Sequence, residues 1–152
     1  MDLLVRDIMT RDVVAVAPDT SLSVVAKLFR ERHISGAPVI DGDARPIGVI
    51  TLADLVYPIA PGTLEGRGKS VFYIVTEDAT QLRSVDVPCR REGVVRDVML
   101  AFVLSVPPDK PVRDAVRLMV ADEIHRLLVV DEGRLVGIVS TMDVMRMLAE
   151  NQ

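Results

Sequence analysis

A hydroxyl residue followed three positions later by an aspartate occurs twice in this chain, as Thr51 with Asp54 and as Ser140 with Asp143. Each pair follows a short apolar run that opens with glycine, and both of its side chains lie on the first turn of a helix that begins there. Such a pair can cap the helix. It can also recognise a ligand, because a carboxylate accepts hydrogen bonds from a cis-diol while the hydroxyl and the helix N–H groups receive an anion.

Both pairs belong to a longer internal repeat. Residues 5–9 (VRDIM) recur as residues 95–99 (VRDVM), and after a one-residue slip in a turn, residues 48–54 (GVITLAD) correspond to residues 137–143 (GIVSTMD). A repeat of this length predicts two copies of one small unit that cannot bury its apolar face alone. We therefore expect the two copies to pack on each other.

Each copy reads as strand, helix, strand, strand, helix. Runs of β-branched residues that end at proline predict strands over residues 13–16 and 103–106. Apolar residues at helical spacing predict helices that begin near Leu22 and Val112. Hairpins are predicted from Ala37–Ile40 with Ile47–Ile50 and from Leu127–Val130 with Leu135–Val139, each followed by a last helix. The expected fold class is α/β (α+β), with two β-α-β-β-α repeats.

Length and composition predict one compact module made of residues 5–57 and 95–150, joined by a linker of residues 58–94 with some extended structure. A net charge of -4 and 3% aromatic residues argue against nucleic-acid binding. The longest uncharged apolar stretch, Val98 to Val106, is far shorter than the roughly 20 residues of a membrane span. The single cysteine, Cys89, and an acidic N-terminus without an apolar signal region favour the cytoplasm.

These features resemble a tandem pair of cystathionine-β-synthase (CBS) domains, often called a Bateman module. The resemblance covers about residues 5–57 and 95–149. It is carried by the two Gly-led Ser/Thr-x-x-Asp segments and by the strand phrases at residues 34–41 (ISGAPVID) and 124–131 (IHRLLVVD). It implies repeats related by pseudo-twofold symmetry, with clefts between them that often bind adenosine-containing ligands. It also implies a regulatory module that dimerises.

The resemblance gives Asp54 and Asp143 a ribose-binding role, and Thr51 and Ser140 a phosphate or hydroxyl role. It also implies that His125-Arg126 reaches the phosphates held at Thr51 and Asp54. We expect that cleft to be the stronger of the two. The competing interpretation of His125-Arg126 is an arginine salt bridge beside a surface histidine. The adenine slot is expected between Val14, Val16, Ala37 and Pro38, and in the second cleft between residues 104–106 and Leu127-Leu128, although core packing alone would explain these apolar residues.

No nucleophile, base and orienting group that would make an enzyme occur together in the sequence, and its two histidines are too far apart to suggest a metal site. We therefore expect a non-enzymatic sensor that needs no cofactor and responds to an adenine nucleotide (AMP, ADP or ATP) or to S-adenosylmethionine. The expected partners are that ligand, a second copy of the chain through Met145 and Leu148, and an unidentified regulated protein. The alternative is a purely structural dimerisation or docking module.

Overall fold

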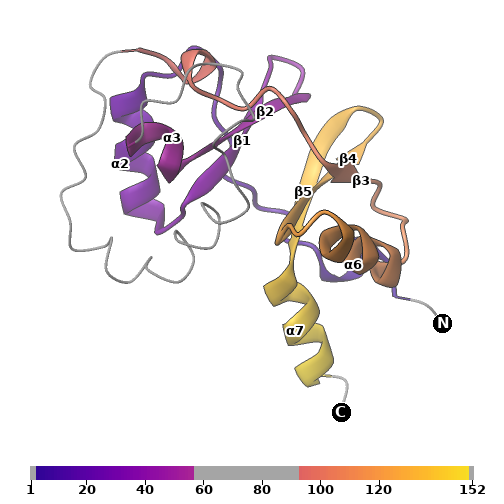
Figure 1. Ribbon diagram of the computed structural model, residues 1–152. Helices are drawn as coiled ribbons and strands as arrows, with labels where there is room; N and C mark the ends of the chain where they lie inside the picture. Colours follow the sequence, from indigo (N-terminus) through magenta and orange to yellow (C-terminus); the bar gives the residue numbers. More distant parts are fainter. Residues whose placement is uncertain (1–2, 57–92, 151–152) are drawn as a thin grey trace. The chain divides into compact units, whose positions relative to one another are not determined.

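The computed structural model describes residues 3–56 and 93–150, and most of the linker predicted over residues 58–94 lies outside them. The described elements form a mixed α/β fold (Figure 1), so the predicted fold class is confirmed. In chain order they are α1 (Val5–Ile8), α2 (Leu22–Arg32), β1 (Gly36–Ile40), β2 (Pro46–Thr51), α3 (Leu52–Val56), the 3-10 turn η1 (Val95–Asp97), β3 (Ser105–Val106), α6 (Val112–Ala121), β4 (Arg126–Asp131), β5 (Arg134–Ser140) and α7 (Thr141–Glu150).

Two compact units make up the chain, and their boundaries differ from those of the sequence repeats. One unit combines residues 1–13, 43–45 and 103–152, and the other combines residues 14–42 and 46–102. The segment that opens each repeat, residues 5–13 or residues 95–102, therefore belongs to the unit built on the other repeat. We call these two the exchanged segments. The division into residues 5–57 and 95–150 describes the duplication and, as a statement about domains, stays a prediction.

The unit built on the first repeat is a β1–β2 hairpin with α2 and α3 packed together (Figure 1). Helix α2 begins where the Ser21 hydroxyl accepts the Val24 N–H at 3.4 Å, as expected for an N-cap serine. It buries Leu22, Val25 and Phe29, which recur at helical spacing. These side chains share one core with residues from β1, β2 and α3 and with Val95 and Val98 from the incoming segment.

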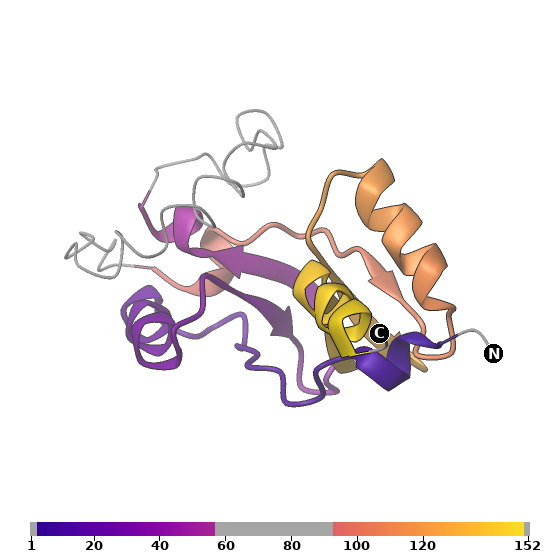
Figure 2. The same cartoon turned by 90° about the horizontal axis from the view of Figure 1, so that it is seen from below.

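The unit built on the second repeat has a three-stranded sheet in the order β3-β4-β5, with helices α6, α7 and α1. Figure 2 shows α1 beside α7. Its core gathers Ala115 and Met119 of α6, three strand residues of the β4–β5 hairpin, and Val5 and Met9 of the incoming segment. In both units, therefore, a hairpin, helices and the segment that opens the other repeat form one core.

The first strand of each repeat is shorter than the sequence predicted. Residues 13–16 contribute a single parallel bridge between Val16 and Val39, and residues 103–106 contribute only the two-residue strand β3. The chain passes from one unit to the other next to these strands, between Val13 and Val14 and between Phe102 and Val103.

The exchanged segments dock through the same contacts in both units. The N–H groups of Val5 and Arg6 donate to the carbonyl oxygens of Lys110 at 2.8 Å and Pro108 at 2.9 Å. At the equivalent positions, the N–H groups of residues 95 and 96 donate to the carbonyl oxygens of residues 20 and 18, at 2.9 and 2.8 Å. The valine at the start of each segment is fully buried. The repeated VRD sequence thus anchors each exchanged segment to the unit built on the other repeat.

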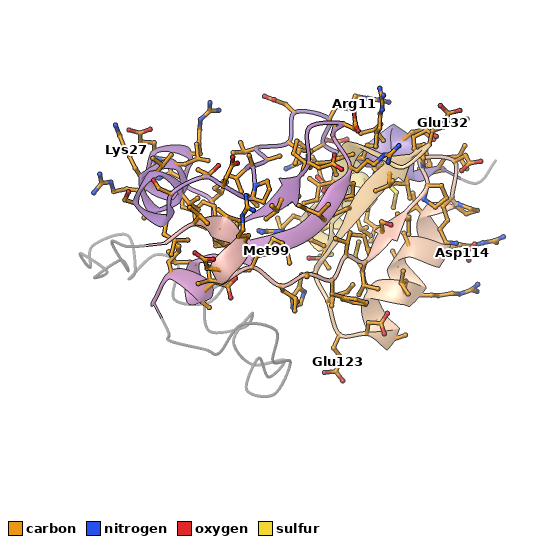
Figure 3. All side chains as sticks on the ribbon, turned by 90° about the horizontal axis from the view of Figure 1, so that it is seen from above. Arg11, Lys27, Met99, Asp114, Glu123 and Glu132 are labelled. Carbon is orange, nitrogen blue, oxygen red and sulfur yellow. The ribbon has the colours of Figure 1, made fainter. Side chains whose placement is uncertain are left out.

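Glycine lets each exchanged segment approach its host strand. A Cβ on Gly48 would lie 2.7 Å from the Leu100 carbonyl oxygen and 3.1 Å from the Met99 sulfur. A Cβ on Gly137 would lie 2.7 Å from the Met9 sulfur, at the end of a flexible side chain, and 3.0 Å from the Thr10 carbonyl oxygen. Met99 is labelled in Figure 3, beside the first-repeat hairpin. The glycine that opens each GVITLAD-type segment therefore has a packing reason.

Candidate functional site

The Thr51–Asp54 pair forms a closed arrangement at the junction of β2 and α3. The Asp54 Oδ2 atom accepts the Thr51 N–H at 2.7 Å and the Thr51 hydroxyl at 3.2 Å. The Leu52 N–H donates to the Ser35 carbonyl oxygen at 2.8 Å, which fixes the start of the helix against β1. Asp54 is only 4% exposed. A charged carboxylate is thus held in a buried position by short, charge-assisted bonds.

The Ser140–Asp143 pair repeats this arrangement at the junction of β5 and α7. Asp143 Oδ2 accepts the Ser140 N–H at 2.8 Å and the Ser140 hydroxyl at 2.6 Å. The Asp143 N–H lies 3.3 Å from Ser140 Oγ and donates to it, which completes a capping box. Asp143 is 7% exposed. We call the two arrangements the first and second Ser/Thr–Asp boxes.

The second box also contains an arginine that the sequence analysis missed. The Arg146 guanidinium lies 3.4 Å from Asp143 Oδ1, the carboxylate oxygen that the serine does not use. The Arg146 side chain is 64% exposed, so this ion pair is screened by solvent. An arginine three residues after an aspartate on a helix was the signal that could have identified it.

The structure places His125 and Arg126 beside the second box. The His125 carbonyl oxygen accepts the Thr141 N–H at 3.0 Å, and Arg126 is the ladder partner of Ser140 in the β4–β5 pair. Ser35 and Gly36 hold the corresponding positions beside the first box, where Gly36 is the ladder partner of Thr51. The phosphate-binding role of His125 and Arg126 at Thr51 and Asp54 stays a prediction.

The residues predicted as an adenine slot lie along β1 and the bridge before α2. The Val16 N–H donates to the Pro38 carbonyl oxygen at 3.0 Å. Val16 and Ala37 belong to the core of the first-repeat unit, Pro38 is buried, and Val14 is partly exposed. Val16 and Ala37 therefore have a packing role whether or not a ligand is present. In the other unit, Leu127 and Leu128 are buried in the same way.

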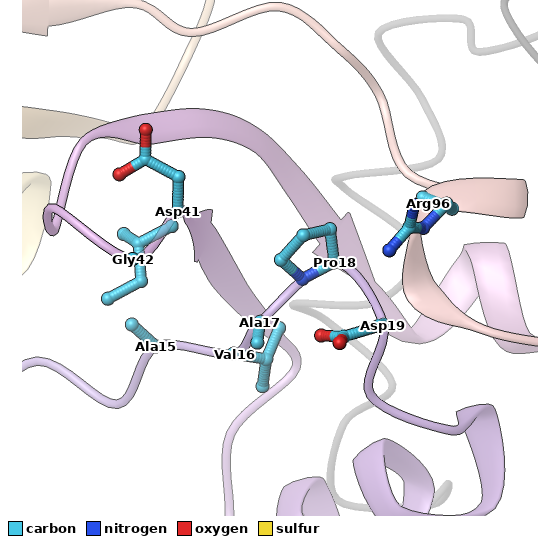
Figure 4. Close-up of a pocket in the computed structure, with 9 residues that line it drawn as sticks. Ala15, Val16, Ala17, Pro18, Asp19, Asp41, Gly42 and Arg96 are labelled. Carbon is cyan, nitrogen blue, oxygen red and sulfur yellow. The ribbon is translucent and has the colours of Figure 1, made fainter.

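A cavity of about 500 Å³ lies in the first-repeat unit, away from the box. Figure 4 shows Asp41 and Gly42 on one side of it and Asp19 and Arg96 on the other. Only Val16 among its lining residues belongs to the predicted slot. Because Gly36 pairs with Thr51 at the start of β1, the cavity lies near the opposite end of that strand.

Two classes of site find no support in the part of the chain that the structure describes. Residues 3–56 and 93–150 contain no group of three or more histidine, cysteine, aspartate or glutamate side chains arranged to hold a metal ion. Among the described helices, none is long and apolar enough to cross a membrane.

Comparison with known proteins gives relatives over almost the whole chain. The Methanocaldococcus jannaschii protein MJ1426 is 35% identical over 96% of this chain and 91% of its own length. The crystal structure of CBSX2 from Arabidopsis thaliana is 27% identical, covers 99% of this chain and 97% of that one, and superposes with a TM-score of 0.72.

Two structures of similar proteins contain adenosyl compounds. A structure of CBSX2 in complex with AMP is 26% identical, with a TM-score of 0.69 and coverage of 97% of both chains. The CBS domain pair of MJ0100, in complex with 5′-methylthioadenosine and S-adenosyl-L-methionine, covers all of both chains with a TM-score of 0.68. At 21% identity, that second likeness concerns the fold.

The family model described as CBS domain matches twice, over residues 5–60 and 95–150. Each match contains one exchanged segment, one hairpin and one Ser/Thr–Asp box. The resemblance inferred from the repeated sequence is therefore confirmed, and this chain belongs to the CBS domain family as a tandem pair.

Proposed function

We propose that this chain is a regulatory, non-catalytic module that binds an adenosyl compound, of the adenine nucleotide or S-adenosylmethionine class, at its Ser/Thr–Asp boxes. The observation that carries the proposal is the buried carboxylate of each box, which is 4% exposed in Asp54 and 7% exposed in Asp143. Family membership and the AMP complex of CBSX2 support the choice of ligand. The ligand would act as an effector, and no further cofactor is required.

Each box can supply both halves of a nucleoside phosphate site. In the first box, Thr51 binds Asp54 through Oδ2, and in this proposal the ribose hydroxyls bind the same buried carboxylate. In this proposal the Thr51 hydroxyl turns its single proton from Asp54 Oδ2 to a phosphate oxygen when the ligand binds. In this proposal Val14, Val16, Ala37 and Pro38 bound the adenine ring.

We propose that the first box binds more tightly than the second. His125 and Arg126 are proposed as donors to the ligand phosphate at the first box. The Arg126 side chain is exposed and, among the described residues, has no hydrogen-bond or ion-pair partner, so binding an anion would break no contact of the described chain.

Calorimetric titration with AMP tests the function. Asp54→Asn removes the charge that holds the ribose, and hydrogen bonds to charged groups are worth about 1.5–3 kcal/mol, so we expect AMP affinity at the first box to fall at least about tenfold. Asp143→Asn is the matched control and should lower that affinity much less than Asp54→Asn does, because it leaves the first carboxylate in place. The thermal stability of each variant without ligand shows whether it folds.

A panel of ADP, ATP, S-adenosylmethionine, NAD and cyclic dinucleotides extends the titration to other ligands that contain adenosine or a related nucleotide. The absence of heat for every compound at millimolar concentration would rule out the sensor and favour the structural module.

We also propose that the module forms a homodimer through helix α7. Met142, Met145 and Leu148 are 64%, 61% and 55% exposed, and their spacing of three places them on one side of the helix. Apolar side chains gathered in this way are typical of an interaction surface. In this proposal the dimer works in the cytoplasm and transmits ligand occupancy to a regulated protein partner.

A further inference from the structure

Each Ser/Thr–Asp box lies on a strand that also holds an exchanged segment. In β5, Ile138 exchanges two backbone hydrogen bonds with Thr10, at 2.8 and 2.9 Å, and the strand ends two residues later at Ser140. In β2, Val49 exchanges two such bonds with Leu100, at 3.0 and 2.9 Å, and the strand ends two residues later at Thr51. The position of each box is thus fixed next to a docked segment.

The same segments continue directly into the apolar residues proposed to bound the ligand of the other box. Four residues after Thr10 the chain reaches Val14, and then Val16, whose carbonyl oxygen accepts the Ile40 N–H at 2.9 Å. Four residues after Leu100 it reaches Leu104, whose carbonyl oxygen accepts the Leu128 N–H at 3.1 Å. Residues 10–14 and 100–104 therefore form two short covalent links, each between the strand of one box and the wall of the other.

The docking of each segment leaves little free space. The Cβ position of Gly137 is 2.7 Å from the Met9 sulfur and 3.0 Å from the Thr10 carbonyl oxygen. The Cβ position of Gly48 is 2.7 Å from the Leu100 carbonyl oxygen. Close-packed backbone of this kind transmits a displacement to its neighbours instead of absorbing it.

We propose that the two boxes are energetically coupled through residues 10–14 and 100–104, so that a ligand at one box raises the affinity of the other. A ligand that orders Val14 and Val16 also orders Thr10, and the strand that ends at Ser140 then loses less freedom when its own box is filled. The coupling is reciprocal, as linkage requires. This coupling rests on the proposed function for its ligand. The mechanical link between Val16 and the strand that ends at Ser140 can be measured without any ligand.

The test places a substitution in one unit and measures the other. In a chain that carries Asp143→Asn, AMP binding reports the first box, and Gly137→Ala is added to disturb the docking of residues 9 and 10 on β5. We expect AMP affinity to fall at least about fivefold, the lower end of typical allosteric couplings. Gly42→Ala is the control, because a Cβ at Gly42 meets nothing within 4 Å, and it should change the affinity less than twofold although Gly42 belongs to the unit that contains the first box.

Amide hydrogen exchange gives a second readout that needs no ligand. Gly137→Ala should speed exchange at the Val16 and Ile40 amides, which are bonded in the other unit. Met9→Ala, which removes the sulfur and leaves the backbone bonds, replaces Gly137→Ala if that variant does not fold. An unchanged AMP affinity in a folded variant overturns the coupling, whatever the exchange rates. If AMP fails to bind the Asp143→Asn chain, the proposed function fails at the first box, and the exchange rates at Val16 and Ile40 alone decide the coupling.

Discussion

At the scale of single residues, the two box aspartates combine a structural role with a binding role. Oδ2 of each carboxylate accepts an N–H and a hydroxyl from the residue three positions before it. The sequence offered capping and ligand recognition as alternatives for Thr51 and Asp54. The geometry shows that capping occurs, and it is compatible with recognition, because a carboxylate can accept several hydrogen bonds at once.

The second box allows a prediction about which contact matters for stability. Asp143→Ala leaves the Ser140 N–H without its acceptor in a nearly buried position, and we expect it to lower the free energy of unfolding by about 1–3 kcal/mol. Arg146→Ala removes only a solvent-screened partner and should cost no more than about 0.5 kcal/mol. Urea denaturation measures both values.

Arg117→Ala is the matched control for Arg146→Ala, because Arg117 pairs with Asp114 in the same i, i+3 geometry at 3.2 Å on α6, and Asp114 belongs to neither Ser/Thr–Asp box. The two arginine variants should behave alike. A loss for Arg146→Ala as large as that for Asp143→Ala would mean that the ion pair, and not the cap, holds the carboxylate.

At the scale of elements, each repeated VRD segment packs in the unit built on the other repeat, although it opens its own repeat in the sequence. Asp7 Oδ2 accepts the Leu4 N–H at 2.8 Å and Asp97 Oδ2 accepts the Val94 N–H at 2.9 Å, so each aspartate caps a short helical turn. Val5 and Val95 fill the core of the unit built on the other repeat. Neither unit has a complete core without the exchanged segment that comes from the other repeat.

Val5→Ala tests this exchange of elements. Burial of a valine side chain is worth about 1.5–3 kcal/mol, and Val5 has no exposed surface, so we expect a loss of stability in that range. Hydrogen exchange should rise in β4 and β5 of the second repeat, although the substitution lies in the first. Arg6→Ala is the control because Arg6 is exposed, and it should change stability by less than about 0.5 kcal/mol. Faster hydrogen exchange confined to β1 and β2 would contradict the packing of Val5 in the second-repeat unit.

At the scale of the whole molecule, the proposed homodimer depends on one exposed helix face. Met145→Glu places a charge among Met142 and Leu148, and we expect the dimer dissociation constant to rise at least about tenfold, which corresponds to about 1.4 kcal/mol. Light scattering across a dilution series measures it. Val120→Glu is the control, because Val120 on α6 is 72% exposed but lies outside this face. Equal effects of the two substitutions would argue against an interface on α7.

The amino-acid sequence by itself determined the duplication, the order of helices and hairpins, the two Ser/Thr–Asp boxes and the family. These features depend on periodicity, turn residues and spacing, which act between residues close together in the chain. Three features were decided only by the tertiary structure. Val5 packs in the core of the second-repeat unit and Val95 in that of the first, Gly48 and Gly137 admit a neighbouring backbone, and Arg146 contacts Asp143. The first two depend on contacts between residues about 40 to more than 100 positions apart. A repeat does not show with which copy a segment packs, because both copies offer it a similar surface.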